Sequence, residues 1–368
     1  MTRSPSKLER AAARNIVTRC LQARAGENAI VESWDHTMPM ASAVVDELRR
    51  VGGKVLLVRD DEDSWWRSID RRQAPLLGQS SAPEWAALRA ADLYVNFWGP
   101  ADTDRMERLP ESADAAFDYT PAWYEAARKV GLRGVRMTTG FATERRARQW
   151  GRSLPKWEES VARASLVAPE ELARRGARLF RALSRGKMVR IIHPNGTDLE
   201  VALAGLAPRL QDGRPRPYRA GDSPSGMLHQ IPAGSVDVAL DSRTVEGRFR
   251  ANRRTNIWWN WHAGGDLAFV GGRLASYSFE EGEDGFVRQY KRGSPGKDRT
   301  SVLKFGLNPA VHDVPNLETV EAGAVALQIG GNRYLNGGNR SSFFSWFSLA
   351  GSEIAVDGTT VVRAGKLL

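Results

Sequence analysis

The 368-residue sequence contains a single cysteine, Cys20, which excludes an internal disulfide and a cysteine-based zinc site. No apolar run reaches the roughly 18 residues that a membrane-spanning helix needs. The first residues, MTRSPSKLERAAARN, are basic but have no apolar core, so they do not form a secretory signal. We therefore expect a cytoplasmic protein.

Lysine is scarce, because only nine of the 53 basic residues are lysines, and the formal net charge is +10. The arginines are spread along the chain, with short runs at 145–148 and 250–254. A nucleic-acid-binding protein is expected to show a basic helix, a fingerprint motif or a clustered basic stripe, and none is evident. We therefore expect no nucleic-acid partner, and favour an anionic peptide or small molecule.

Most motifs of catalysis and cofactor binding are missing. No G-x-G-x-x-G opens a helix after the first strand, and there is no P-loop and no G-x-S-x-G elbow. None of the five histidines lies in a metal-binding motif, although His193, His229 and His262 could still converge in three dimensions. The histidines are His36, His193, His229, His262 and His312.

Apolar patterns divide the chain into two halves. Strand-like segments at 29–34, 54–60, 91–99 and 131–140 alternate with helical patterns, which indicates an α/β domain with a mostly parallel sheet. Residues 144–187 read as a helical connection. From Met188 onward, short strands alternate with turn residues, including the hairpin signals Asn195–Gly196 and Asp357–Gly358. The prediction is an α/β domain over 1–187 and a β-rich domain over 188–368.

The stretch 306–347 reads GLNPAVHDVPNLETVEAGAVALQIGGNRYLNGGNRSSFFSWF. Its frame is GLNP, an apolar strand ending in GGN, and a second GGN followed by Arg and two serines. This frame resembles the metal-site region of the aminopeptidase T family of metallopeptidases. The iron-dependent dihydroxypyridine ring-opening dioxygenase is a fold relative of that family. Segments 193–205, 221–249 and 353–366 resemble the same family, so the resemblance implies an aminopeptidase T-like two-domain fold and a homodimer that pairs through the β-rich domain.

The family's metal ligands lie in the motifs A-G-E-V, E-L-x-x-G-x-N-P, G-T-V-H-I-A-x-G and G-G-x-N-x-S-x-x-H-x-D. By resemblance, the ligand positions fall here at Ser235, Val302, Ala326, Phe344 and Trp346. Valine, alanine, phenylalanine and tryptophan cannot coordinate a divalent ion, and serine is a poor ligand. A two-metal hydrolase needs carboxylates and histidines to activate water. We therefore expect no metal cofactor and no conventional metallo-aminopeptidase activity.

Aromatic residues stand where the ligands are missing, and they either fill the emptied cavity or line a cleft that grips a ligand. Candidate ligand-binding residues are Ser235, Trp259, Trp261, Tyr334, Arg340, Phe344 and Trp346. Candidate catalytic residues are His262, Lys304 and Tyr334. Asn308, Asn332 and Asn339 are further polar candidates, and the last two equally suit turns beside glycines.

The leading functional hypothesis is a metal-free pseudoenzyme. It would bind a peptide in the former active-site cleft and present or shape it for modification by pathway enzymes, as in peptide natural-product biosynthesis. The alternative is an active enzyme of another class, either a metal-independent hydrolase or lyase or a metalloenzyme with relocated histidine ligands. A third hypothesis is a structural subunit that pairs with an active paralogue.

Overall fold

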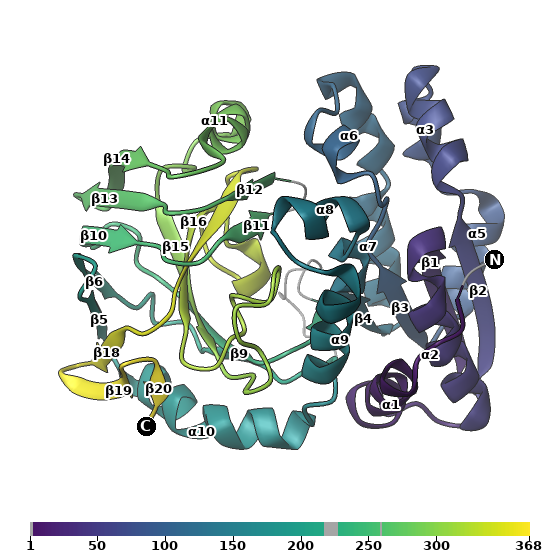
Figure 1. The fold of residues 1–368 in the computed structure, drawn as a ribbon, viewed down its shortest axis with the longest axis horizontal. Helices are drawn as coiled ribbons and strands as arrows, with labels where there is room; N and C mark the ends of the chain where they lie inside the picture. Colours follow the sequence, from purple (N-terminus) through teal and green to yellow (C-terminus); the bar gives the residue numbers. More distant parts are fainter. Residues whose placement is uncertain (1–2, 217–226, 258–259) are drawn as a thin grey trace. The chain divides into compact units, whose positions relative to one another are not determined.

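The computed structural model describes residues 3–216, 227–257 and 260–368. The chain forms two compact units, Met1–Ala168 with Gly213–Pro232 and Pro169–Asp212 with Ala233–Leu368. The predicted α/β and β-rich organisation is confirmed (Figure 1). The prediction placed the domain boundary between residues 187 and 188. In the structure the helix Pro169–Arg185 belongs to the β-rich unit, so this boundary lies before Pro169.

The first unit is built on a five-stranded parallel sheet of order β2-β1-β3-β4-β8. Helices α5 and α7 pack on the face that carries Ile30 and Tyr94, and α2 lies along β1 and β2. The elements are α1 (Lys7–Asn15), η1 (Ile16–Cys20), β1 (Asn28–Trp34), η2 (Asp35–Thr37), α2 (Met38–Arg50), β2 (Lys54–Asp60), α3 (Glu62–Asp70), α4 (Ala74–Leu77), α5 (Ala82–Ala90), β3 (Leu93–Phe97), α6 (Thr103–Glu107), η3 (Glu111–Phe117), α7 (Thr120–Lys129), β4 (Arg133–Met137), η4 (Thr138–Phe141), α8 (Glu144–Gln149), α9 (Leu154–Ala164) and β8 (Leu228–Ile231).

Strand β8 comes from the second half of the sequence, yet it pairs with β4 in parallel and completes the first sheet. Its pairing begins at Gly134 opposite Leu228 and ends at Met137 opposite Ile231. Thr138 adds a side-chain hydrogen bond of 3.2 Å to the carbonyl of Ile231. The local sequence of β8 does not indicate this partner, because strand pairing depends on residues far away in the chain.

The second unit contains two larger antiparallel sheets, of order β14-β13-β10-β6-β5-β18-β19-β20 and β17-β16-β15-β9-β7, and the pair β11-β12. Its elements are α10 (Pro169–Arg185), β5 (Met188–His193), β6 (Thr197–Ala202), β7 (Arg209–Gln211), β9 (Ser235–Ala239), β10 (Glu246–Arg250), β11 (Thr255–Ile257), β12 (Asn260–His262), β13 (Asp266–Val270), β14 (Arg273–Ser278), α11 (Glu283–Arg292), β15 (Thr300–Gly306), β16 (Val325–Gly330), η6 (Arg333–Leu335), β17 (Phe344–Leu349), β18 (Glu353–Val356), β19 (Thr359–Arg363) and β20 (Lys366–Leu367).

Both predicted hairpins are confirmed. Asn195–Gly196 lies between β5 and β6, and Asp357–Gly358 lies between β18 and β19. Asp357 and Gly358 both have positive φ angles, of 46° and 79°, as a two-residue hairpin turn of type I′ requires.

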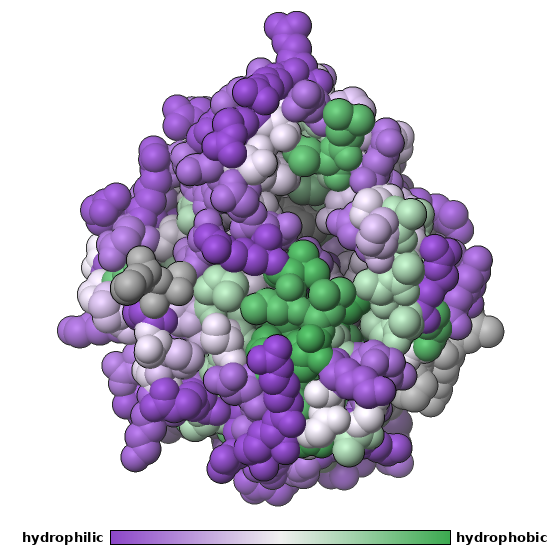
Figure 2. Space-filling model, turned by 90° about the vertical axis from the view of Figure 1, so that its right-hand side faces the viewer, coloured by the Kyte–Doolittle hydropathy of each residue, from purple (hydrophilic) through white to green (hydrophobic). Residues whose placement is uncertain are grey.

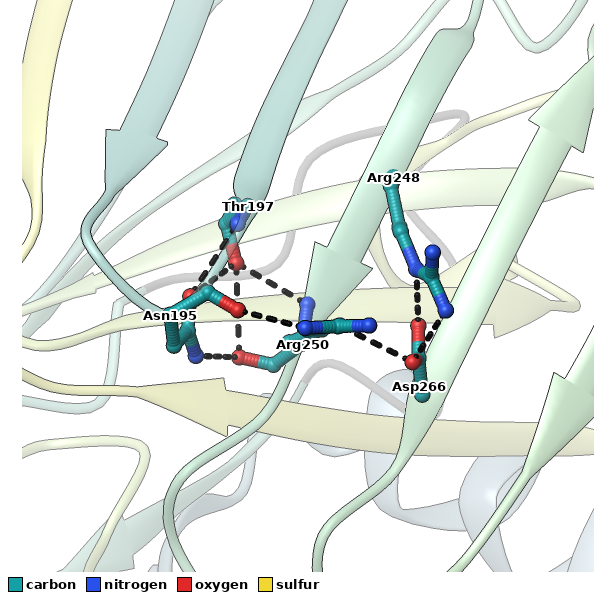
Figure 3. Close-up of polar contacts among 5 residues, drawn as sticks. All are labelled: Asn195, Thr197, Arg248, Arg250 and Asp266. Atoms are coloured by element: carbon teal, nitrogen blue, oxygen red, sulfur yellow. Dashed lines mark hydrogen bonds and ion pairs between the residues drawn. The ribbon is translucent and has the colours of Figure 1, made fainter.

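A polar network holds the β5–β6 turn against strands β10 and β13 (Figure 3). Arg250 donates to the carbonyl of Asn195 at 2.8 Å and to the carboxylate of Asp266 at 2.9 Å. Arg248 binds both oxygens of the same carboxylate, and the amide of Asn195 donates to the carbonyl of Arg250 at 2.8 Å. These charge-assisted bonds fix the turn and the strand ends to one another.

Helix α10 packs on one face of the five-stranded antiparallel sheet. A Cβ added at Gly176 would lie 2.8 Å from the side chain of Leu307 and 3.3 Å from that of Val236, so glycine permits the helix to approach closely. The same face carries fully buried residues such as Leu303, Leu327 and Phe347. The opposite face of this sheet carries the polar residues described next.

Among the described residues, no helix has both the length and the apolar character needed to cross a membrane.

Candidate functional site

The candidate site lies on one face of the sheet β17-β16-β15-β9-β7. Directly opposite residues on neighbouring strands share a face, and so do residues two apart on one strand. Asp237 pairs with Lys304, Lys304 pairs with Ala326, and Gln328 pairs with Trp346. The register therefore puts all five positions where the resemblance expects metal ligands on this single face, namely Ser235, Val302, Ala326, Phe344 and Trp346.

The side chains at these positions do not fit a divalent metal ion. Val302 and Ala326 are fully buried hydrophobic residues, and Phe344 and Trp346 present aromatic rings. Only Ser235 carries an oxygen, and that oxygen is already engaged. Over the described ranges, no three His, Cys, Asp or Glu side chains lie close enough to hold a metal ion. No step of metal chemistry can therefore be assigned to this face.

Asp237 is the centre of the polar cluster on this face, and its side chain is 1% exposed. Ser235 donates to Oδ1 of Asp237 at 2.6 Å, and the hydroxyl of Tyr334 donates to Oδ2 at 3.4 Å. The ammonium of Lys304 lies 3.8 Å from Oδ2, and the lysine side chain is 13% exposed. The buried carboxylate thus accepts from two hydroxyl donors and lies near the ammonium of Lys304, and Arg209 is its direct neighbour on β7. Such partners are what a charge removed from water requires.

The ring of Trp346 forms the aromatic wall of the cluster. The ammonium of Lys304 lies 4.6 Å from the centre of this ring, within the range of a cation–π interaction. Trp346 and Tyr334 are both half-buried and pack against a small apolar cluster that includes Val302 and Leu335. Lys304, Tyr334 and Trp346 are each partly exposed, whereas the carboxylate of Asp237 is buried.

Burial is the main reason why the pKa of Tyr334 lies well above its ordinary value, and the negative charge of Asp237 raises it further. The positive charge of Arg209 opposes this shift. Tyr334 consequently stays protonated at neutral pH and serves as a hydrogen-bond donor. In this arrangement it is not a general base.

His262 lies away from this cluster. Its ring stacks on Phe347 at 4.8 Å and 27°, and it contacts Phe279 at 5.1 Å. Its Nε2 lies 3.4 Å from the hydroxyl of Ser345. Ser345 and Phe347 alternate with Trp346 along β17, so they point to the opposite face of the sheet. Burial lowers the pKa of His262 to about 3, which leaves the ring neutral.

The remaining candidates do not meet at the cluster. Trp261 lies on β12, and the guanidinium carbon of Arg254 is 4.8 Å from the centre of its ring. Arg340 is exposed in the loop before β17. Phe344 begins β17 and lines an open pocket with Arg292 and Gln289 of α11. Trp259 lies outside the described residues.

The asparagines of the sequence frame hold loops rather than present free polar groups. Asn308 donates to the carbonyl of Ala233 at 2.8 Å, and Asn332 donates to the carbonyl of Ser301 at 3.2 Å. Asn339 donates to the carbonyl of Gly296 at 2.9 Å. These three asparagines therefore bind backbone carbonyls of neighbouring loops, and this role needs no metal ion.

Sequence reasoning missed Asp237. A signal was present, because an acid in the apolar strand SVDVA needs a buried partner to offset its loss of hydration. The partner, Lys304, likewise stands in an apolar strand, TSVLKFG. Only the pairing of β9 with β15 shows that these two charges meet.

No protein-family model and no curated protein matches the chain. Two solved structures are similar over nearly the whole length. One is wild-type AmpT from Thermus thermophilus, with a TM-score of 0.76 and 18% identity over 98% of this chain and 99% of that chain. The other is the 2,5-dihydroxypyridine dioxygenase from Pseudomonas putida, with a TM-score of 0.64 and 14% identity over 98% and 97%. The chain therefore has the two-domain fold of aminopeptidase T, as the resemblance implies, and at these identities the likeness shows the fold alone.

Proposed function

We propose that the chain is a metal-free pseudoenzyme that binds a peptide on the face of Asp237, Lys304, Tyr334 and Trp346. The bound peptide is presented or shaped for modification by partner enzymes, with peptide natural-product biosynthesis as the setting. The protein acts in the cytoplasm as a homodimer and does not bind nucleic acid.

One observation carries the proposal. The face that would hold metal ligands bears instead a lysine ammonium beside an aromatic wall, with a tyrosine hydroxyl next to it. An ammonium attracts a carboxylate or a peptide carbonyl, and aromatic walls with a few polar groups are typical of ligand-binding surfaces. Lys304, Tyr334 and Trp346 are each partly exposed, so a ligand can reach them.

The direct test is native mass spectrometry of the full chain with a pool of linear peptides of roughly four to twelve residues, all with free termini. We expect retained peptides with a dissociation constant of about 100 µM or tighter, about −5.5 kcal/mol. Substitution Lys304→Met or Trp346→Ala is expected to weaken binding by about tenfold or more, about 1.4 kcal/mol. The exposed Lys366→Met is the matched control, because it removes a lysine from β20 without touching the site. Absence of any complex at about 1 mM peptide, about −4 kcal/mol, overturns the proposal.

A second candidate function, a metal-independent hydrolase or lyase, is favoured by the same cluster, since Ser235, Asp237, Lys304 and Tyr334 lie together. The same spectra separate the two functions. A peptide that changes mass with wild-type protein but not with Lys304→Met indicates catalysis, whereas a peptide released unchanged indicates binding alone.

A further inference from the structure

The parallel sheet of the first unit reverses its strand order beside β1. The chain passes from β1 to β2 on one side, and it then crosses to β3 on the other side of β1. In open α/β sheets, ligands bind in the crevice outside the carboxyl ends of the strands at such a reversal. We therefore expect a ligand site of this unit near the carboxyl ends of β1 and β3.

Side chains of opposite charge form a row across this end of the sheet. Glu32 of β1 is the direct neighbour of Asn96 of β3, which is in turn the direct neighbour of Arg136 of β4. Asp60 ends β2 and follows two residues after Val58, the neighbour of Glu32, so its side chain is on the same face. This charged row, which consists of Asp60, Glu32, Asn96 and Arg136, has two carboxylates at one end and a guanidinium at the other.

Aromatic residues position both ends of the charged row. The hydroxyl of Tyr94 donates a hydrogen bond to the carboxylate of Glu32. Arg136 donates to the hydroxyl of Tyr124 at 2.8 Å, and its guanidinium carbon lies 4.5 Å from the centre of the Trp98 ring. The charged groups are therefore held in place without a ligand, which lowers the entropic cost of binding one.

The carboxylate end lacks positive charge. Among the described residues, none forms an ion pair with Glu32 or Asp60. Loss of hydration is the main reason why the pKa of Glu32 is raised, and burial raises the pKa of Asp60 to about 7, with the negative charges of Glu32 and Glu84 adding to that shift. Over the described ranges these acids belong to no group that could hold a metal ion, which favours an organic cation such as an ammonium group.

The guanidinium end lacks an acceptor. The Nε atom of Arg136 is buried and has no hydrogen-bond partner in the described part of the chain. A buried donor without a partner is costly, and an arginine fork matches the two oxygens of a carboxylate. This end of the charged row therefore suits the carboxylate group of a ligand.

The charged row is accessible to a small molecule, because each of its four side chains is partly exposed. Leu56, four residues before Asp60 on the same face of β2, is 48% exposed, so apolar surface adjoins the row. Figure 2 views the side of the molecule where β2 and α3 run in Figure 1, and it shows a contiguous hydrophobic patch near its middle with a hollow beside it.

We propose that the charged row binds a free amino acid as a zwitterion, with the ammonium group at Glu32 and Asp60 and the carboxylate group at Arg136. Neighbouring strands lie about 5 Å apart, so about 10 Å separates the backbones of Glu32 and Arg136, a span that two long side chains and one small zwitterion fill. A ligand with only one of the two charges leaves the other end of the row unmatched. The site does not rest on the peptide-binding proposal, since all its residues belong to the first unit.

The test is isothermal titration calorimetry of the full chain with each protein-forming amino acid. We expect at least one of them to bind with a dissociation constant of about 1 mM or tighter. The methyl ester of that amino acid lacks the carboxylate charge, and its N-acetyl derivative lacks the ammonium charge. Each derivative should bind about tenfold more weakly or worse, because each loses one charge-assisted contact. This comparison needs only the wild-type chain.

Substitutions then locate the binding site. Glu32→Gln and Arg136→Met should each weaken binding by about tenfold or more. Asp63→Asn and Arg89→Met are the matched controls, because these exposed residues of α3 and α5 remove one charge of each sign from the same unit. Circular dichroism shows which variants fold. The proposal is overturned if no amino acid binds at about 10 mM, if either derivative binds as tightly as its parent, or if a folded Glu32→Gln or Arg136→Met variant binds like the controls.

Discussion

The ammonium of Lys304 on β15 lies 3.8 Å from the carboxylate of Asp237, its direct neighbour on β9. This pair stands on the face where the resemblance expects the ligands of metal ions. Lys304 therefore places a positive charge on that face, and the carboxylate of Asp237 lies close to this charge.

Substitution Lys304→Met removes the ammonium that lies 3.8 Å from the buried carboxylate of Asp237. We expect the free energy of unfolding to fall by about 3 kcal/mol, the typical cost of removing one partner from a buried pair. The double variant Lys304→Met with Asp237→Asn should recover much of this loss, because no charge remains buried. Urea unfolding measures both, with Lys366→Met expected within about 0.5 kcal/mol of wild type. Equal stability of Lys304→Met and Lys366→Met would show that the pair contributes nothing.

His262 should make the stability of the protein depend on pH. Its pKa in the folded state is about 3, below its ordinary value, because the ring is buried. Between that pKa and about 6.5 the unfolded chain binds the additional proton, so the free energy of unfolding falls as the pH falls through this window. The slope attributable to His262 is at most about 1.4 kcal/mol per pH unit. Urea unfolding at several pH values should show a shallower slope for His262→Phe, and identical slopes would contradict the burial described here.

Tyr334 should ionise only at a pH well above that of an ordinary tyrosine. Its pKa is raised by burial and by Asp237, so its contribution to stability is present below about pH 10 and is lost as the pH rises beyond it. The difference in ultraviolet absorbance between wild type and Tyr334→Phe during an alkaline titration isolates this group. A phenolate that appears near pH 7 would instead qualify Tyr334 as a base.

Metal content is expected to stay well below one equivalent per chain. The five positions on the site face offer no carboxylate or imidazole, and Lys304 places a positive charge among them. Elemental analysis of protein purified without chelator, from cells supplied with zinc, iron, manganese and cobalt, measures this. One or two equivalents of a single metal would point to ligands outside this face.

Much of the fold could be predicted because its signals are local. The alternation of apolar segments such as KVLLVRD with helical patterns indicated the parallel sheet. The pairs Asn195–Gly196 and Asp357–Gly358 indicated hairpins because their backbones accept positive φ angles. The lack of a carboxylate or imidazole at Ser235, Val302, Ala326, Phe344 and Trp346 was also visible in the sequence.

Other features depend on partners that no local pattern specifies. Strand β8 lies in the half of the sequence that is predicted to be β-rich, but it completes the first sheet beside β4. His262 and Trp346 both qualified as site residues, yet they lie on opposite sides of the sheet. A shift of one residue in strand register reverses which side chains face the site, and the sequence does not state the register.

The sequence by itself determined the two classes of domain, the turns, and the absence of metal-binding side chains at the expected positions. These properties follow from backbone preferences and side-chain chemistry, which act within a few residues. The tertiary structure alone decided that Asp237 meets Lys304, that the ring of Trp346 lies against Lys304, and that His262 is buried among aromatic rings. Such contacts join residues far apart in the chain, and they form only when the strands pair in one register.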